Sequence, residues 1–539
     1  MNSTQAERVA QAFPLITTAG SSVLRVLRVI HDQHTYVKLF LIGPVLAALL
    51  SLVLLRVTCH LRRRAGTVAF FHPYANDGGG GERVLWCAIE AIQSTCPWVK
   101  IAVYSGDGVT EQQLRDKARS RFGVRIERAV RVVPVRTRTL LEPTWYPALT
   151  MIGQAAGSTV VALECLVRFI PEVWFDTTGW AFPYPLARAA GCRVACYVHY
   201  PTVSSDMIER VRSRTATYNN AGAVARSWVL TAGKTAYYWG LMRLYGWCGQ
   251  HAQTVMVNSS WTKGHIEKVW RSKKIALVYP PCDCATLSTL PIDGRDPDRP
   301  IVLSIGQFRP EKDHVLQLRA MKRLRNLHAA SDSALRGPAR TRVESCRLVV
   351  IGSTRNAGDE ARLRQVKREA GRLGLGEDDV TFLENLPYSE LQRWLGRAAC
   401  GLHTMRDEHF GISVVEFMAA GAVPIAHASG GPRMDIVVPG GVSVQEGESQ
   451  VGLLCETEDE YARAIAQVCA MAPGDRAAVA RRARARALQF STAAFQRAFE
   501  RPFLDVVPKR PMHMVYGVAK APREERAAGR PAGGGPHDE

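Results

Sequence analysis

Short apolar runs alternate with longer amphipathic stretches along most of this chain. In the first half, the apolar runs predict strands at Thr67 to Phe71, Lys100 to Tyr104, Val130 to Val135, Glu172 to Phe175 and Arg193 to Val198. A helix is predicted from about Arg83 to Ser94. Strands that alternate with helices in this way are typical of a parallel sheet covered by helices.

The second half repeats the pattern. Its predicted strands are Ile301 to Ile305, Arg347 to Ile351, Val380 to Leu383, Gly401 to His403 and Val423 to Ala426. Its predicted helices are Asp313 to His328, Glu360 to Leu373 and Ile412 to Ala420. We therefore expect an α/β protein with two Rossmann-like, doubly wound domains that face each other across a cleft. Ligands would bind at the carboxyl ends of both sheets.

Composition shifts divide the chain further. The predicted parts are an N-terminal segment (1–36), a transmembrane anchor (37–57), an N-terminal domain (65–280), a linker (281–300), a C-terminal domain (301–480), a C-terminal helix returning to the N-terminal domain (481–507) and a disordered tail (508–539). The linker is rich in Pro, Asp and Gly, and the tail in Pro, Gly, Arg and Glu. Ala329 to Ser345 is small and polar, which predicts an insertion loop.

The predicted anchor contains an uncharged run from Leu39 to Leu55. Spanning a bilayer takes about 20 residues, so Val37 and Val57 would extend the run while Lys38 and Arg56 snorkel. A core helix or a signal-peptide core is the alternative. The basic flanks slightly favour a cytosolic body on the C-terminal side.

Two later segments have a composition that suits a membrane surface. Tyr146 to Ile170 is apolar but carries Glu164 and Arg168, and Trp228 to Trp247 mixes Trp and Tyr with basic residues. Helices of this kind can lie in the headgroup layer. The alternative is that both are core helices of a large α/β domain.

The chain has 539 residues, a formal net charge of +20 and 13 scattered cysteines. The charge suits an anionic membrane or anionic substrates, and no nucleic-acid-binding signature is present. The cysteines lack the spacing of a zinc site, and their odd number argues for reduced thiols in a cytosol-facing protein. We expect no metal and no cofactor.

Candidate site residues in the second half follow predicted strands. Glu408 and Glu416 bracket Phe410, Gly411 and Ile412, where a helix begins. Free backbone N–H groups at such a helix start can bind phosphate. Gly306, Arg309 and Lys312 follow another strand, and two cations there could neutralise a diphosphate. Ser429, Gly430 and Gly431 form a further loop at the same rim.

The first half offers a glycine loop and a histidine. Gly78, Gly79, Gly80 and Gly81, followed by Glu82 and Arg83, lie between the first strand and the first helix. Four glycines allow close backbone approach to a phosphate or a sugar. His199 ends the strand that precedes Pro201, and it could hydrogen-bond a reacting sugar. A plain turn and a core histidine are the alternative interpretations.

Taken in order, these motifs resemble the family 4 glycosyltransferases of the GT-B fold. The resemblance is carried by an E-x7-E element at Glu408 to Glu416 and by GQFRPEKDH at Gly306 to His314. FFHPYANDGGGGERVLW at Phe70 to Trp86 and YVHYPTVSSDM at Tyr197 to Met207 are similar to the eukaryotic dolichol-linked oligosaccharide mannosyltransferases of that family. The resemblance covers roughly Thr67 to Phe503 and includes the N-terminal anchor.

The resemblance implies a retaining, metal-independent transfer of mannose from GDP-mannose. The acceptor would be dolichyl-diphosphate-linked Man3GlcNAc2 and then Man4GlcNAc2, extended with α-1,2 linkages on the cytosolic face of the endoplasmic reticulum for protein N-glycosylation. Other early-pathway mannosyltransferases would be partners.

The resemblance also implies roles for the candidate residues. Arg309 and Lys312 would hold the diphosphate, Glu416 the ribose and Glu408 the mannosyl ring. His199 would contact the sugar near its anomeric carbon, and the glycine loop would close on donor and acceptor. The remaining alternatives are another lipid-acceptor transferase, making a glycolipid or a phosphatidylinositol mannoside, and an idle membrane scaffold.

Overall fold

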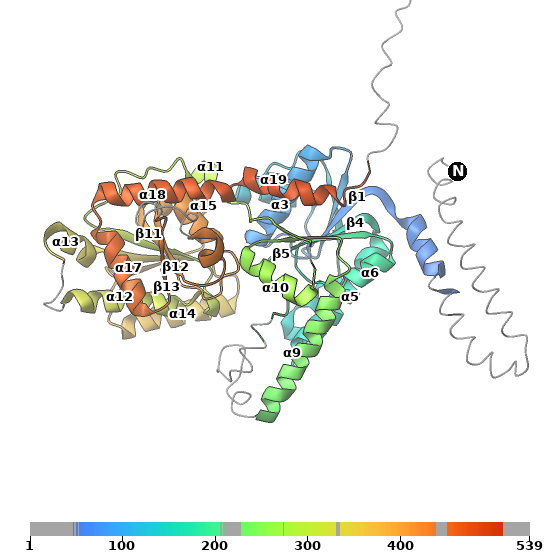
Figure 1. Cartoon of the computed structure of the whole chain (residues 1–539), viewed down its shortest axis with the longest axis horizontal. Helices are drawn as coiled ribbons and strands as arrows, with labels where there is room; N and C mark the ends of the chain where they lie inside the picture. Colours follow the sequence, from blue (N-terminus) through green and yellow to red (C-terminus); the bar gives the residue numbers. More distant parts are fainter. Residues whose placement is uncertain are drawn as a thin grey trace, which may run out of the picture.

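The computed structural model describes residues 53–204, 228–272, 274–329, 335–437 and 450–509, together with 47, 50, 51 and 207. Two parallel sheets with covering helices lie side by side, one built from each half of the sequence (Figure 1). The two doubly wound halves that the apolar pattern predicts are therefore confirmed.

The N-terminal half has a seven-stranded sheet of order β3-β2-β1-β4-β5-β6-β7. Its strands are β1 (Arg64–Phe71), β2 (Lys100–Ser105), β3 (Val130–Pro134), β4 (Pro171–Asp176), β5 (Arg193–Val198), β6 (Thr254–Val257) and β7 (Ile275–Leu277). All five strands predicted for this half are confirmed. The sequence prediction missed β6 and β7, which are the shortest, because three or four residues carry little periodicity.

The helices of this half cover both faces of its sheet. They are α3 (Gly80–Thr95), α4 (Glu111–Phe122), α5 (Thr150–Arg168), α6 (Tyr184–Ala189), α9 (Trp228–Gly249) and α10 (Ser260–Trp270), with short turns η1 (Thr137–Leu141) and η2 (Pro143–Trp145). Helix α3 begins three residues before the predicted start. Gly80 and Gly81 are therefore in its first turn, and the loop proper ends at Gly79.

The C-terminal half has a six-stranded sheet of order β10-β9-β8-β11-β12-β13. The strands are β8 (Ile301–Ile305), β9 (Arg347–Gly352), β10 (Val380–Glu384), β11 (Ala398–His403), β12 (Val423–His427) and β13 (Leu453–Cys455). The helices and turns are α11 (Cys284–Leu287), η3 (Pro310–Lys312), α12 (His314–Ala329), α13 (Gly337–Ser345), α14 (Ala357–Arg372), α15 (Tyr388–Arg397), α16 (Ile412–Ala420), η4 (Pro432–Ile436), α17 (Glu458–Ala470), α18 (Pro473–Ala487), η5 (Leu488–Phe490) and α19 (Thr492–Leu504).

One prediction in this half is wrong. Ala329 to Ser345, expected to be an insertion loop, contains helix α13. Pro338 stands in the first turn of that helix, where proline is favoured, and Val343 is fully buried in the core. The small, polar composition of this segment does not indicate a helix, because Val343 is the one side chain that α13 buries.

Both sheets reverse their strand order once, between β1 and β4 and between β8 and β11. Open parallel sheets bind ligands beyond the carboxyl ends of the strands at such a switch point. The glycine loop follows β1, and Gly306, Arg309 and Lys312 follow β8. The topology thus brings the predicted site residues to the two switch points.

The C-terminal helices bridge the two halves. Helix α18 lies on the second half, and α19 packs against α3 of the first (Figure 1). Phe495, Phe499 and Phe503 enter the core of the N-terminal half, where Phe499 lies 5.7 Å from Phe175 between ring centroids. Where the chain crosses, the Cys282 N–H donates to the Phe490 carbonyl at 2.8 Å.

The structure describes only part of the segments that are predicted to contact a membrane. Most of 37–57, and 510–539 of the predicted tail, lie outside the described residues. Within the described part of the chain, α5 alone is long and apolar enough to cross a bilayer, a test that core helices also pass.

Candidate active site

Glu408 is the centre of the polar contacts beyond β11. The Lys312 ammonium donates to Glu408 Oε2 at 2.7 Å, and His403 Nε2 lies 3.1 Å from the same oxygen. Burial alone would raise the pKa of Glu408, but Lys312 and the His403 hydrogen bond hold that pKa well below its ordinary value. Glu408 is thus a fixed carboxylate at the switch point of the second sheet.

Two glycine positions make this loop geometry possible. Gly411, the residue before α16, has a φ of 102°, and Gly430 has a φ of 57°. A Cβ on Gly430 would lie 2.2 Å from the Glu408 carbonyl oxygen. The Gly431 N–H donates to that carbonyl at 2.8 Å, and the Asp407 N–H donates to Ser429 Oγ at 2.7 Å. Ser429 to Gly431 therefore supports the loop that carries Glu408.

Arg309 precedes the short turn η3, and Lys312 is the last residue of that turn. Lys312 is engaged by Glu408, and its side chain lies against Gly306, where a Cβ would be 3.6 Å from it. Arg309 is more exposed, and its nearest acidic partner is Glu311 at 3.8 Å. Arg309 is thus the freer of the two cations for an incoming anion.

Phe410 and Glu416 differ in what they can reach. The Phe410 ring is buried in the core, 5.7 Å from the Tyr279 ring and 5.4 Å from the Phe490 ring. Only its backbone is left to contact a donor. Burial raises the pKa of Glu416 to about 6, although the positive charges of Arg83 and Arg121 in the N-terminal half lower it. Glu416 therefore faces the junction between the halves.

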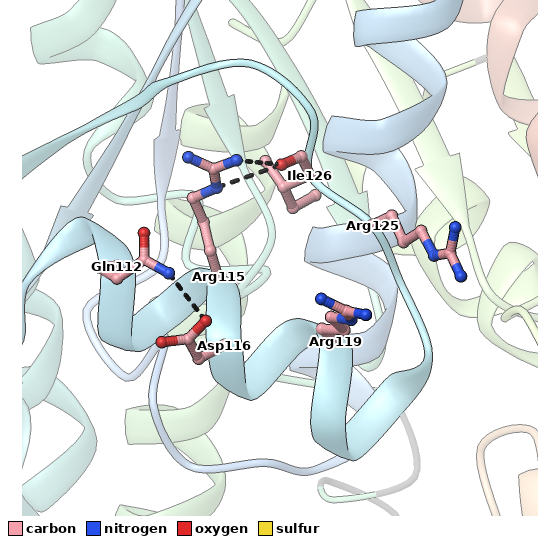
Figure 2. Close-up of a pocket in the computed structure, with 6 residues that line it drawn as sticks. All are labelled: Gln112, Arg115, Asp116, Arg119, Arg125 and Ile126. Atoms are coloured by element: carbon pink, nitrogen blue, oxygen red, sulfur yellow. Dashed lines mark hydrogen bonds between the residues drawn. The ribbon is translucent and has the colours of Figure 1, made fainter.

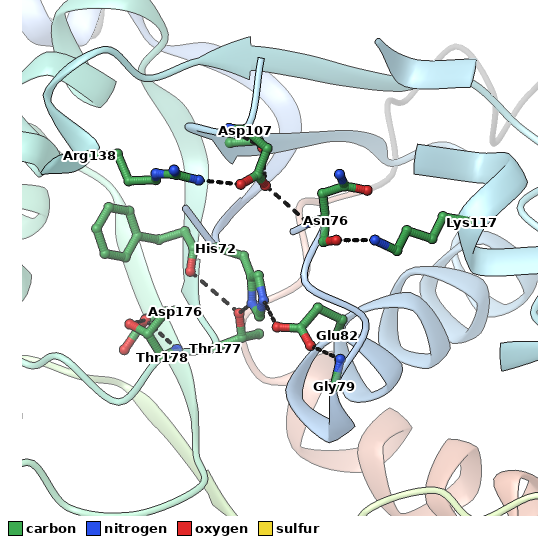
Figure 3. A network of polar contacts seen from close by, with 12 residues as sticks. His72, Asn76, Gly79, Glu82, Asp107, Lys117, Arg138, Asp176, Thr177 and Thr178 are labelled. Atoms are coloured by element: carbon green, nitrogen blue, oxygen red, sulfur yellow. Dashed lines mark hydrogen bonds and ion pairs between the residues drawn. The ribbon is translucent and has the colours of Figure 1, made fainter. Parts of the chain in front are cut away.

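A second polar network lies beyond β1 and β4 (Figure 3). Glu82 accepts from His72 Nε2 at 3.1 Å and from the Gly79 N–H, while His72 Nδ1 lies 2.6 Å from Thr177 Oγ1. These contacts tie the glycine loop to the switch point of the first sheet. Gly78 in this loop has a φ of 86°. Glu82 thus shapes the loop, in addition to any ligand contact.

His199 follows β5 and points toward the start of α3. A Cβ on Gly81 would lie 3.6 Å from His199 Nε2. That nitrogen is buried and has no hydrogen-bond partner among the residues that the structure describes. Burial lowers the pKa of His199 to about 4, so its imidazole is neutral near pH 7. A buried, unpaired nitrogen of this kind is available for a substrate hydroxyl.

The two halves meet through an aromatic stack. The rings of Tyr200 and His409 are 3.9 Å apart between centroids and tilted by 6°, and Trp261 lies 5.6 Å from His409 at a 10° tilt. Tyr200 adjoins His199, and His409 adjoins Glu408. The stack therefore brings the candidate residues of the two sheets to one junction.

Asp435 is a further link between the halves. It lies in η4 and accepts from the Ser260 N–H at 3.0 Å and from the Tyr279 hydroxyl at 2.9 Å. Sequence reasoning missed Asp435, as well as His72, His403, His409, Tyr200 and Trp261. His403 ends β11, and His199 directly follows β5, so strand ends could have indicated His403. Asp435 and Trp261 lie in helical turns and give no such signal.

One pocket lies apart from these residues. It has a volume of about 240 Å³ and is lined by Gln112, Arg115, Asp116, Arg119, Arg125 and Ile126 on α4 and the loop after it (Figure 2). The Arg115 guanidinium donates to the Ile126 carbonyl, and Gln112 donates to Asp116 at 2.8 Å. No predicted site residue lines this pocket.

Each half of the chain matches the model of a known protein family. Residues 65–270 match the family model described as ALG11 mannosyltransferase N-terminus, and residues 290–486 match glycosyl transferases group 1. The fold resembles sucrose-phosphate synthase from Thermosynechococcus elongatus, with a TM-score of 0.57, 17% identity, and coverage of 82% of this chain and 98% of that one. This likeness confirms the GT-B fold.

Curated relatives are similar over most of their length. The GDP-Man:Man(3)GlcNAc(2)-PP-Dol alpha-1,2-mannosyltransferase of Homo sapiens is 42% identical over 446 residues, which cover 82% of this chain and 86% of the relative. The enzyme of the same name from Xenopus laevis is 40% identical, covering 81% and 87%. That from Caenorhabditis elegans is 38% identical, covering 86% and 96%. The chain therefore belongs to the family of GDP-Man:Man(3)GlcNAc(2)-PP-Dol alpha-1,2-mannosyltransferases.

Proposed function

We propose that this chain transfers mannose from GDP-mannose to dolichyl-diphosphate-linked Man3GlcNAc2 and then to Man4GlcNAc2, forming α-1,2 linkages. The observation that carries the proposal is the Lys312–Glu408 ion pair at the switch point of the second sheet, joined through His409 and Tyr200 to His199 of the first. A charged donor site and an acceptor site at one junction are what a sugar transfer between two substrates requires.

The donor would bind on the C-terminal half. Arg309 and Lys312 would hold the diphosphate, and the free N–H groups at the start of α16, beyond Gly411, would add a favourable dipole. Lys312 would turn from Glu408 toward the phosphate as the donor enters. Glu408 would then accept hydrogen bonds from hydroxyls of the mannosyl ring, and Glu416 from the ribose.

Bond exchange would occur on one face of the sugar. The acceptor hydroxyl oxygen bonds to the anomeric carbon as the bond from that carbon to the GDP oxygen breaks. The hydroxyl proton passes to the departing phosphate, which Arg309 and Lys312 stabilise in its charged form. Because attack and departure share one face, the anomeric configuration is retained. His199 would hydrogen-bond the sugar, and the loop shaped by Glu82 would close on both substrates.

We place this reaction on the cytosolic face of the endoplasmic reticulum membrane. The uncharged run within 37–57 would be a single-pass anchor, with the two sheets on the cytosolic side. The net charge of +20 supports contact with an anionic leaflet, at about 1 kcal/mol per basic residue close to the surface.

Donor and acceptor selection test the proposal together. Membranes carrying the chain are incubated with labelled GDP-mannose or UDP-glucose and with the dolichyl-diphosphate acceptor bearing three mannoses, with chelator present. We expect label in the lipid fraction from GDP-mannose alone. Binding of GDP-mannose without transfer would move the acceptor assignment to another lipid. Absence of both binding and transfer would leave a catalytically idle scaffold.

A further inference from the structure

One face of α5 is an apolar stripe that no part of the described chain covers. Its large side chains are 45 to 56% exposed, and a small alanine fills the one gap between them. They are Ile152, Ala156, Val160, Leu163 and Val167. Their spacing of three or four residues places them on one side of the helix. At 1.5 Å per residue the stripe is about 22 Å long. A helix facing water would carry polar residues here.

The opposite face of α5 belongs to the domain core. Val161, Ala162, Cys165 and Leu166 are buried in the cluster that packs against β4 and β5. A helix held in this way cannot leave the sheet to cross a bilayer, although its length of 19 residues would allow a span. The stripe can therefore meet lipid only if α5 lies parallel to the membrane surface.

Neighbouring elements extend the stripe at both ends. At its C-terminal end, Arg62 donates to the Val167 carbonyl at 2.8 Å, which ties the end of the helical residues 53–62 to the end of α5. At its N-terminal end, the Ile152 N–H donates to the Tyr237 hydroxyl of α9 at 3.3 Å. Helix α9 projects from the domain beside α5 (Figure 1).

These neighbours are also apolar on the outside. Helical residues 53–62 expose Leu54, Leu55 and Leu61, and α9 exposes Trp239, Leu244 and Trp247. Of the large apolar side chains exposed in the described residues, all but Met434, Leu488 and Leu504 lie on or next to these three helices. The exposed apolar side chains are thus concentrated on these three helices and the residues next to them.

The charges around this surface are basic or paired. The Arg243 guanidinium lies 5.0 Å from the Trp239 ring centroid, and Lys234 lies 5.8 Å from that of Tyr238. Glu164, the one acidic residue of α5, accepts from the Thr137 hydroxyl at 2.6 Å and pairs with Arg168 at 2.8 Å. Aromatic residues beside cations, around an apolar strip, suit the boundary between lipid headgroups and acyl chains.

We propose that α5 lies in the plane of the bilayer and that α5, α9 and residues 53–62 form one lipid-docking surface. The inference rests on the proposed membrane location. Lipid is the occupant because the surface continues through residues 53–62 toward the uncharged run of the sequence and is edged by cations. Docked in this way, the body holds its sugar-transfer junction at a fixed height and tilt above the membrane, where a lipid-linked acceptor is presented.

Fluorescence quenching tests the position of α5 in the full chain. Leu163→Cys is made with Cys59→Ser, since the other cysteines are buried, and is labelled with an environment-sensitive maleimide. Leu504→Cys on α19, 49% exposed, is the matched control. In vesicles of phosphatidylcholine and phosphatidylserine, we expect acyl-chain nitroxides to quench the label at 163 and aqueous iodide to quench that at 504. Iodide quenching at 163, or shielding of 163 from both quenchers by a protein partner, would overturn the proposal.

Activity on two acceptors gives an independent readout. Leu163→Glu with Val167→Glu should lower transfer to a full-length dolichyl acceptor in vesicles by about tenfold or more, since each buried charge weakens docking. Transfer to a short-chain acceptor in detergent, and GDP-mannose binding, should stay within about twofold. Leu504→Glu should change neither. Equal loss on both acceptors would mean that α5 is merely structural, and no loss on either would mean that the stripe does not dock. Wild-type chain that binds GDP-mannose but transfers to neither acceptor would instead count against the proposed function.

Discussion

Lys312 and Glu408 form an ion pair of 2.7 Å between the ends of β8 and β11. The pair joins a cation that follows one strand of the switch point to a carboxylate that follows the other. Both side chains are largely buried, so the pair is protected from screening by salt. Both residues would contact the donor in the proposed reaction. Substitutions in this pair therefore test the proposed reaction most clearly.

Replacing Lys312 with alanine should lower kcat at saturating GDP-mannose by roughly 10²- to 10³-fold, the usual cost of one lost electrostatic donor. The same change leaves Glu408 buried without its cation, so the pKa of Glu408 should rise. Steady-state kinetics across pH checks both effects. Lys367→Ala, which removes a surface pair with Glu384, is the control and should retain full kcat. A normal kcat in Lys312→Ala would show that Lys312 takes no part in the reaction.

Arg309→Ala should also lower turnover at saturating donor, because Arg309 is the freer cation beside η3. Arg309→Lys should recover part of the loss, since it restores the charge but not the planar fork that binds phosphate in two places. Initial rates at saturating GDP-mannose are compared for the wild-type chain, Arg309→Ala and Arg309→Lys. Identical turnover in all three would contradict the diphosphate role.

Glu416 should make both stability and donor binding depend on pH. Its pKa of about 6 in the folded chain lies above the ordinary 4.5, so the folded state binds more protons than the unfolded state between these values. Stability then falls as pH rises from about 4.5 to 6, by up to about 2 kcal/mol. Glu416→Gln should therefore raise the melting temperature at pH 8 more than at pH 4.5.

The same substitution separates stability from function. If the ionised Glu416 binds the ribose, the KM for GDP-mannose should fall as pH rises through about 6, and Glu416→Gln should abolish that change. Melting curves and KM are measured on the same preparations. A pH-dependent KM that persists in Glu416→Gln would assign the titration to another group.

Gly430→Ala should disable the site without replacing a charged side chain. Its φ of 57° disfavours a side chain, and the new Cβ would collide with the Glu408 carbonyl. We expect at least about a tenfold loss of transfer as the Glu408 loop shifts. Gly371→Ala is the control, because Gly371 is an exposed helical residue with open space around its Cβ position. Equal activity of both variants would show that the loop tolerates displacement.

Asp435→Ala should loosen the junction between the two halves. It removes the acceptor for Ser260 and Tyr279, two residues of the N-terminal half. Small-angle scattering should show a larger radius of gyration, and transfer should slow while GDP-mannose binding persists. Asp293→Ala removes an exposed carboxylate 3.9 Å from Arg481 and serves as control. An unchanged radius with normal transfer would mean that the aromatic stack and the C-terminal helices hold the halves together without Asp435.

Periodicity predicted most strands and the bounds of α16, because each buried strand of a parallel sheet is an apolar run between polar loops. Gly411 and Gly421 further mark the limits of α16 with positive φ. The short strands β6, β7 and β13 were missed because neighbours define them more than composition does. Helix α13 was missed because its polar residues face outward around one buried valine.

The site was predicted to the extent that its residues follow strands. Lys312, Glu408 and His199 lie in the segments that follow β8, β11 and β5, so topology brings them to the junction that the order of elements predicts. The contact of Tyr200 with His409 and that of Asp435 with Ser260 depend on how two separate domains pack. No local pattern encodes that packing. Phe410 was predicted to contact the donor, but its ring is buried in the core.

Counting the sugars added to the lipid acceptor tests the mannosyltransferase assignment most directly. Membranes that carry the chain, or Glu408→Gln as control, are incubated with GDP-mannose and dolichyl-diphosphate Man3GlcNAc2. The masses of the released glycans are then measured by mass spectrometry. We predict two added hexoses, both removable by an α-1,2-specific mannosidase, and far less product from Glu408→Gln. A single added hexose, resistance to that mannosidase, or full product from Glu408→Gln would contradict the assignment.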